Sequence, residues 1–311
     1  MKLTVAICTW NRADLLDQTL AEMRRLRIPE GVEWELLVVN NNCTDHTDEV
    51  LARHAGHLPL RRLLEPKQGL SHARNCAVTA AAGELILWTD DDVLVDPEWL
   101  AEYVAAARRW PEALFFGGTI EPWFEVEPPA WIRRNLIDLS GPFAINRRGG
   151  AVRPLAEGER VNGANMGFRR EVFDTDRFDV SLGRMADSLI SGDETEFFDR
   201  LMSRGSSGIW VGSARVRHFI PRARITRAYI AAWFRGYGAT LARLEGPYWG
   251  PRLMGAPRWA VRSFLEALPG SWTFHISLGL RGFPSFRTAR TMRGYIEETR
   301  NRAISTPGTR P

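Results

Sequence analysis

Three consecutive carboxylates are the residues in this sequence most suited to chemistry. Asp90, Asp91 and Asp92 directly follow an apolar run at Leu85–Trp88. Adjacent carboxylates repel one another unless a cation or strong hydrogen-bond donors neutralise them. Mg²⁺ or Mn²⁺ does so with one or two carboxylates and completes its shell with phosphate oxygens and water. The triplet therefore predicts a metal site that holds a diphosphate, and the alternative is that it only caps a helix beginning near Pro97.

Polar side chains also follow two other predicted strands. The first strand leads into Thr9, Asn11 and Arg12, and the second leads into Asn40 and Asn42. Ligands of an open parallel sheet bind outside the carboxyl ends of its strands, so we expect these residues near the aspartates at one sheet edge. The alternative is that Asn11 is a helix N-cap and that the other asparagines only form turns.

One arginine is a candidate for holding phosphate. Arg74 lies near the start of a predicted helix, and it could contact nucleotide or phosphate or, alternatively, form an ion pair with the acidic loop. The sequence has neither a Walker-type lysine loop nor the dinucleotide-binding glycine fingerprint. We therefore expect metal and arginine to hold the diphosphate.

These motifs resemble those of the glycosyltransferase family two enzymes, which are built on the A-type nucleotide-sugar fold (GT-A). The resemblance covers roughly residues 3–218. Thr9–Arg12 is similar to the family's first turn, and residues 40–45 are similar to its Asp-Asn-Asn/Ser-Ser-Thr-Asp turn. Gly69–Asn75 resembles its Gly-x-x-x-Ala-Arg-Asn segment, and Asp90–Asp92 resembles its Asp-x-Asp metal motif. The resemblance implies a transferase that uses a nucleotide diphosphate sugar, with a UDP-sugar favoured.

The resemblance also assigns roles to the residues around the donor. The residues implied in nucleotide binding are Thr9, Asn11, Arg12, Asn40, Asn42, Arg74, Asp90 and Asp91. Asp92, Asp90 and a late histidine, His218, become the implied ligands of Mn²⁺ or Mg²⁺; a lone histidine is otherwise more often structural. Asn40 stands where the family usually has the aspartate that recognises uracil, and an amide can also donate and accept at a base edge.

A second acidic pair is implied in proton transfer. The family carries a Glu-Asp pair whose second acid is the general base of inverting transfer. Here the order is Asp193-Glu194, so Glu194 takes the base position, and either acid could serve. The residues implied beneath donor sugar and acceptor are Asn165, Met166, Gly167 and Arg169. The alternatives are a helix first turn for the acids and a simple turn for the loop.

The elements that must position these residues follow from hydrophobic periodicity. The first 120 residues alternate short apolar runs with helical patterns, which is typical of βαβ units and a mostly parallel sheet. The predicted strands are Leu3–Cys8, Trp34–Val39, Leu60–Leu64, Glu84–Thr89 and Leu114–Ile120. The predicted helices are Ala13–Leu26, Thr44–His54, Ser71–Ala82 and Pro97–Trp110. We therefore predict an α/β fold with a Rossmann-like GT-A sheet flanked by helices, and we expect His218 to follow a further strand.

The chain is expected to have four parts. Residues 1–120 are predicted to form the donor-binding half, and 121–218 the acceptor-side and catalytic half of the same domain. Residues 219–304 are predicted to be a helical extension rich in Arg and Trp, and 305–311 a disordered tail. The extension could lie on an anionic membrane surface or pack on the catalytic domain with its arginines outward.

Charge and composition narrow the function classes. Residues 1–214 carry 24 basic and 33 acidic side chains, whereas 215–311 carry 17 and 4. The basic part suits anionic lipid or a phosphate-bearing substrate, but it shows no known nucleic-acid-binding pattern, so we expect no nucleic acid partner. No apolar stretch reaches the ~20 residues that span a bilayer. The three cysteines are an odd number and show no paired spacing, which favours a cytoplasmic protein. Peripheral contact at the inner face of the membrane is a further expectation.

The acceptor is expected to be a hydroxyl, with a lipid-linked glycan favoured by the basic tail. Two other functions fit the same residues less well. A sugar nucleotidyltransferase also uses a metal on such a sheet, but it generally has a glycine-rich loop with Arg or Lys after the first strand, which Thr9–Arg12 lacks. A non-catalytic protein that binds nucleotide sugar or a membrane partner would explain Asn40 and the reversed Asp193-Glu194 pair.

Overall fold

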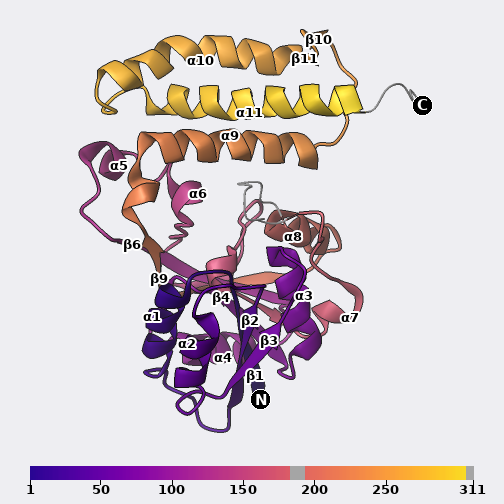
Figure 1. The fold of residues 1–311 in the computed structure, drawn as a ribbon. Coiled ribbons are helices and arrows are strands. Elements are labelled where there is room, and N and C mark those ends of the chain that lie inside the picture. The colour runs from indigo at the N-terminus through magenta and orange to yellow at the C-terminus, as the bar shows by residue number, and fades with distance from the viewer. Residues whose placement is uncertain (183–192, 306–311) are drawn as a thin grey trace. The chain divides into compact units, whose positions relative to one another are not determined.

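The structure, a computed structural model, describes residues 1–182 and 193–305, with the side chains of 193 and 303–305 left out. The described chain forms two compact units. The first comprises residues 1–123, 144–182 and 193–219, and the second comprises 124–143 and 220–305 (Figure 1).

The first unit is built on a nine-stranded sheet in the order β3-β2-β1-β4-β8-β6-β9-β5, with β7 paired to β9. Its strands are β1 (Lys2–Thr9), β2 (Glu33–Asn40), β3 (Leu60–Leu64), β4 (Leu85–Asp90), β5 (Val93–Val95), β6 (Phe115–Phe124), β7 (Val152–Pro154), β8 (Met166–Arg169) and β9 (Gly208–Ile220). The first four positions of the order are parallel, and β8 runs antiparallel to both β4 and β6. The predicted mostly parallel central sheet is confirmed.

Helices cover both faces of this sheet, because its strands carry apolar residues on both sides. In β1, Leu3, Val5 and Ile7 point into one core and Ala6 into the other. One face packs against α1 (Ala13–Met23), α2 (Thr47–His54) and α4 (Trp99–Arg109). The other packs against α3 (Leu70–Ala80), α7 (Val172–Thr175) and α8 (Asp193–Ser203).

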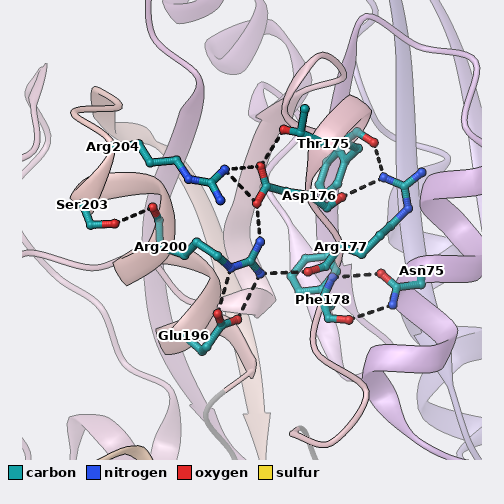
Figure 2. Close-up of polar contacts among 10 residues, drawn as sticks. Asn75, Thr175, Asp176, Arg177, Phe178, Glu196, Arg200, Ser203 and Arg204 are labelled. Carbon is teal, nitrogen blue, oxygen red and sulfur yellow. Dashed lines mark hydrogen bonds and ion pairs between the residues drawn. The ribbon is translucent and has the colours of Figure 1, made fainter.

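An ion-pair cluster around the buried carboxylate of Asp176 ties α8 to the segment after α7 (Figure 2). Asp176 accepts from Arg200, and its second oxygen lies 2.9 Å from Nη1 of Arg204. Two residues further on, the Phe178 backbone exchanges hydrogen bonds of 2.8 and 3.0 Å with the Asn75 side chain on α3. These contacts join the C-terminal end of α8 to the segment after α7, and they join that segment to α3.

One predicted helix start and two alternatives about helix caps are wrong. The first residue of α4 is Trp99 and its N-cap is Glu98, so Pro97 lies outside the helix. Strand β5 separates the aspartate triplet from α4, and therefore the triplet does not cap that helix. The N-cap of α1 is Arg12 rather than Asn11, whose φ of 51° places it in the left-handed region.

The second unit is helical, as predicted for the C-terminal extension. Its main helices are α9 (Arg227–Leu244), α10 (Arg258–Ile276) and α11 (Phe283–Ser305), joined by the short hairpin β10 (Arg252–Leu253) and β11 (Ala256–Pro257). The short helices α5 (Ala130–Arg134) and α6 (Ser140–Phe143) also belong to it. Within this unit, α11 lies between α9 and α10 (Figure 1). None of the helices in the described ranges combines the length and the hydropathy needed to cross a bilayer.

Candidate active site

The parallel pairing of β1 with β2 and β4 brings the polar residues at the ends of these strands to one edge of the sheet. Thr9 pairs in register with Asn40 on β2, and the preceding residue, Cys8, pairs with Asp90 on β4. The last residues of β1, β2 and β4 therefore lie side by side. This is the carboxyl edge, at which open α/β sheets bind their ligands.

A second ladder brings His218 to the same edge. Strand β5 pairs antiparallel with β9, and Val93 is the register partner of His218. We expected His218 to follow a strand, but it lies inside β9. Its Nε2 is 3.4 Å from Oδ1 of Asp92, and ligand atoms of Asp90, Asp92 and His218 all lie within 4.8 Å of one another. The three residues form a group that could hold one metal ion.

In the aspartate triplet, Asp91 and Asp92 are buried and Asp90 is half-buried. Nη1 of Arg12 lies 3.0 Å from Oδ1 of Asp91 and 2.9 Å from Oδ2 of Asp92, and the Thr9 hydroxyl donates to Asp91 over 2.8 Å. Burial raises the pKa of Asp91 to about 6 against the opposing charge of Arg12. Burial, followed by the charge of Asp92, also raises the pKa of Asp90. A bound cation would favour the charged form of these carboxylates.

The donor set of Asp90, Asp92 and His218 fits a divalent metal ion. Two carboxylates are ordinary ligands for both Mg²⁺ and Mn²⁺, whereas Mg²⁺ prefers oxygen ligands throughout. An imidazole nitrogen is more readily accepted by transition metals. The group is thus compatible with Mn²⁺ or Mg²⁺, and its imidazole is the ligand that is less usual for Mg²⁺.

Thr19, on the buried face of α1, shapes the acidic turn and was not predicted as a site residue. Its hydroxyl donates to the Asp91 carbonyl over 3.0 Å and accepts from the Val93 amide over 3.2 Å. A threonine within an apolar helix face gives no sequence signal for this role. Its effect is to hold the chain between β4 and β5.

The predicted asparagines build the neighbouring turns. The Asn40 side chain donates to Asp48 over 2.8 Å and accepts from the Cys43 amide over 2.8 Å. The Asn11 side chain accepts from the Thr44 amide over 2.7 Å, which links the turn after β1 to the turn after β2. Asn42 is exposed and has a φ of 66°, a conformation that asparagine tolerates. These residues lie at the predicted nucleotide edge, and their contact with a nucleotide stays a prediction.

Arg74 and Glu194 meet across 120 positions of sequence. Nη2 of Arg74 lies 2.6 Å from Oε1 of Glu194, and the Gly163 amide donates to Oε2 over 2.8 Å. Arg74 is 2% exposed. Arg74 thus forms an ion pair with Glu194, and Arg12 forms ion pairs with Asp91 and Asp92 of the acidic turn. The side chain of Asp193 lies outside the described residues.

Gly163 was missed as a site residue, although it lies in the loop that the sequence singled out. A Cβ atom at this position would lie 2.1 Å from Oε1 of Glu194 and 2.2 Å from Nη2 of Arg74. Only a glycine lets the backbone amide approach the carboxylate this closely. Several glycines around it gave no sequence signal that this one was constrained.

The remaining loop residues are part of the core. Asn165 is fully buried, and its side chain bonds to Trp99, Tyr103 and the backbone carbonyls of Thr119 and Ala214. Met166 and Gly167 pair with β4 and are buried, and the Arg169 guanidinium donates to the carbonyls of Ala107, Trp110 and Ala113. Asn165 and Arg169 thus stabilise the sheet beneath the site, and their predicted contact with donor or acceptor stays a prediction.

Fold and site together define a class of protein, the GT-A transferases, in which a nucleotide-binding half-sheet meets an acidic turn at the carboxyl edge. Residues 4–176 match the model of Glycosyl transferase family 2. The chain belongs to this family and is a glycosyltransferase of glycan biosynthesis.

Curated relatives and solved structures agree with this assignment. The chain is 24% identical over 261 residues to the glucosyl-dolichyl phosphate glucuronosyltransferase of Haloferax volcanii, an alignment that covers 79% of each chain. It is 25% identical to the succinoglycan biosynthesis protein ExoM of Rhizobium meliloti, over 78% of this chain and 75% of that one. The mannosyltransferase PcManGT of Pyrobaculum calidifontis, solved with GDP-Man and Mn²⁺, shares the fold with a TM-score of 0.54 at 18% identity, over 97% of this chain and 73% of that one.

Proposed function

We propose that this glycosyltransferase is inverting and metal-dependent, and that it transfers a sugar from a UDP-sugar to an acceptor hydroxyl. The observation that carries the proposal is the group formed by Asp90, Asp92 and His218 at the carboxyl edge of the sheet. The solved relative with GDP-Man and Mn²⁺ supports a metal at this edge. A bound divalent ion would neutralise charge on the leaving diphosphate.

Residues of the protein are proposed to supply the general base, its orientation and the nucleoside site. Glu194, or Asp193 beside it, accepts the proton of the acceptor hydroxyl while that oxygen bonds to the anomeric carbon and the bond to the nucleoside diphosphate breaks. Arg74 and the Gly163 amide hold the Glu194 carboxylate in one orientation before the acceptor arrives. Thr9, Asn40 and the turn at Asn42 border the space proposed for the nucleoside.

The acceptor is proposed to be a lipid-linked glycan. The support is the relative from Haloferax volcanii, whose name gives a dolichyl phosphate sugar as its acceptor. We propose with it a cytoplasmic location with peripheral contact at the inner face of the membrane. The three free thiols of Cys8, Cys43 and Cys76 are compatible with a reducing compartment.

The first experiment is thermal stabilisation by uridine, guanosine, thymidine and cytidine diphosphates, with and without Mn²⁺. We expect UDP to raise the melting temperature of the wild type only with metal, and to have no such effect on Asp92→Asn. Stabilisation by another nucleotide would correct the donor class. Equal stabilisation of both proteins would contradict the metal assignment.

The catalytic step needs its own experiment. With the donor identified, Glu194→Gln is expected to retain nucleotide binding and to lose transfer, and the anomeric configuration of the first product, read by NMR, is expected to be opposite to that of the donor. Asp193→Asn is the matched variant. If Asp193→Asn lost transfer and Glu194→Gln kept it, Asp193 would be the general base instead of Glu194. Binding without transfer by the wild type across a broad acceptor panel would favour the non-catalytic alternative.

A further inference from the structure

The outer side of α10 carries an unusual number of exposed apolar side chains. Leu265, Leu268, Trp272 and Ile276 are 55%, 37%, 69% and 72% exposed. At 100° per residue they fall within about 80° of arc on the helix. The buried residues of α10, which include Ala267 and Phe274, lie on the other side, where α10 packs on α11. Within its unit, α10 is the layer beyond α11 (Figure 1).

The corner that follows α10 continues this surface. Leu278 is 72% exposed and has a φ of 53°, in the left-handed region that leucine rarely adopts. In water, both the backbone conformation of this leucine and the exposure of its apolar side chain raise the free energy of the folded protein. We call Leu265, Leu268, Trp272, Ile276 and Leu278 together the α10 face.

The unit that carries the α10 face is basic. Residues 219–305 contain 14 arginines and 4 glutamates. Each glutamate has a partner within the unit: Glu245 accepts from Tyr295, and the others pair with arginines, Glu266 with Arg262, Glu297 with Arg235 and Arg293, and Glu298 with Arg243. Residues 219–305 therefore carry a formal net charge of +10 (14 − 4), and residues 124–143 of the same unit, with two arginines and three acidic residues, change this only by −1.

Basic residues also lie along the same side of the helix. Arg258 is seven residues, about two helical turns, before Leu265 and therefore lies on the same side of α10. Arg262 lies about 60° around the helix from Leu265, next to the apolar stripe. A narrow apolar stripe with arginines along it suits a surface that offers both hydrocarbon and negative charge. It suits a second copy of the same basic unit poorly, because like charges would meet.

We propose that the α10 face docks on the surface of an anionic lipid bilayer. The apolar side chains enter the boundary between headgroups and acyl chains, with Trp272 at the level of the headgroups. The arginines remain at the lipid phosphates, their aliphatic parts lying along the apolar surface. The proposal does not depend on the donor, the metal or the catalytic base proposed above.

The test is flotation of the full-length protein with vesicles of phosphatidylcholine alone or mixed with phosphatidylglycerol. We expect binding to the anionic vesicles, weakened by added salt. The double variant Trp272→Ser, Ile276→Ser is expected to lower the partition coefficient at least about tenfold. The matched control is Leu64→Ser, Val180→Ser, two similarly exposed apolar residues of the first unit, which should bind like the wild type.

A second variant separates docking from folding. Leu278→Gly removes the strained side chain, so it is expected to keep or raise the melting temperature and still to weaken vesicle binding. Equal flotation of wild type and both α10 variants, or no flotation of the wild type with anionic vesicles, would overturn the proposal. A wild-type dimer in light scattering that Trp272→Ser, Ile276→Ser abolishes would assign the face to self-association instead. Nucleotide-induced stabilisation is expected to be unchanged in every variant, so its failure would bear on the catalytic proposal alone.

Discussion

At the scale of single residues, Arg12 offsets part of the negative charge of the acidic turn. It pairs with both Asp91 and Asp92. Its side chain is 37% exposed, so we expect Arg12→Ala to lower the free energy of unfolding by about 1–2 kcal/mol rather than by the larger value of a fully buried pair. The measurement is denaturant unfolding with and without Mn²⁺.

Metal should compensate for the lost arginine. Mn²⁺ is expected to stabilise Arg12→Ala more than it stabilises the wild type, because more negative charge is left at the turn. Arg25→Ala, which removes only an exposed pair with Glu22, is the control and should show neither effect. An equal response of all three proteins to Mn²⁺ would place the metal away from this turn.

Gly163 gives a prediction about the orientation of the base. In Gly163→Ala the new methyl group would overlap Glu194 and Arg74, and these side chains must move. We expect kcat to fall about 10- to 100-fold, as for a displaced catalytic group, with little change in nucleotide affinity. Gly56→Ala, where an added Cβ meets nothing within 4 Å, is the matched substitution. A loss of nucleotide affinity with kcat preserved would assign the Arg74–Glu194 pair to donor binding.

At the scale of elements, the β5–β9 ladder decides the metal site, because it sets His218 opposite Val93. His218→Ala is expected to reduce the stabilisation by Mn²⁺ with nucleotide strongly, and the stabilisation by Mg²⁺ less, since Mg²⁺ makes less use of a nitrogen ligand. Thermal shift titrations with the two metals measure this. His57→Ala, on an exposed turn, is the control. A parallel loss for both metals would contradict this difference between Mn²⁺ and Mg²⁺.

The sequence predicted the first half of this sheet well, because β1, β2 and β4 are continuous apolar runs that end in polar residues. It did not predict β5, a three-residue strand directly after three carboxylates, since so short a run carries no periodicity. It also did not predict that Arg74 meets Glu194 or that Asn165 bonds to Trp99, because such contacts depend on how distant elements pack. The sequence thus predicted which residues belong to the candidate site, but it did not predict which residues they contact.

The attachment of α8 gives a prediction on stability and pH. Burial disfavours the Asp176 carboxylate, but the Thr175 hydroxyl, Arg204 and Arg200 outweigh burial and lower its pKa. Asp176→Asn is expected to cost about 1–2 kcal/mol at pH 7, because it removes a carboxylate partner from Arg204 and from Arg200, whose side chains are 55% and 26% exposed.

The sign of the pH dependence follows from the lowered pKa. A carboxylate with a lowered pKa stabilises the folded state above its unfolded pKa, about 3.9, and this contribution is lost as pH falls through the folded value. The difference in free energy of unfolding between wild type and Asp176→Asn should therefore be constant near neutrality and shrink below about pH 4. A difference that grows on acidification would contradict the ion-pair origin.

At the scale of the whole molecule, the family match ends before the site is complete. It stops at residue 176, whereas Glu194 lies on α8 and His218 on β9. A fragment of residues 1–176 lacks β9, which lies between β6 and β5 in the sheet. We expect this fragment to show no cooperative thermal transition and no nucleotide-dependent stabilisation by Mn²⁺, in contrast to the full chain. A cooperative, nucleotide-stabilised fragment would show that the donor half folds alone.

The place of β9 in the sheet also bears on how the protein is made. Domains fold progressively as the ribosome releases them, N-terminal parts first. The aspartate triplet leaves the ribosome long before His218, and β5 has no partner strand until β9 emerges. The growing chain must therefore carry the acidic turn and β5 without β9 while the next 126 residues, up to His218 (218 − 92), are made. The active site is completed late, so incomplete products released before residue 218 would lack the full metal-binding group.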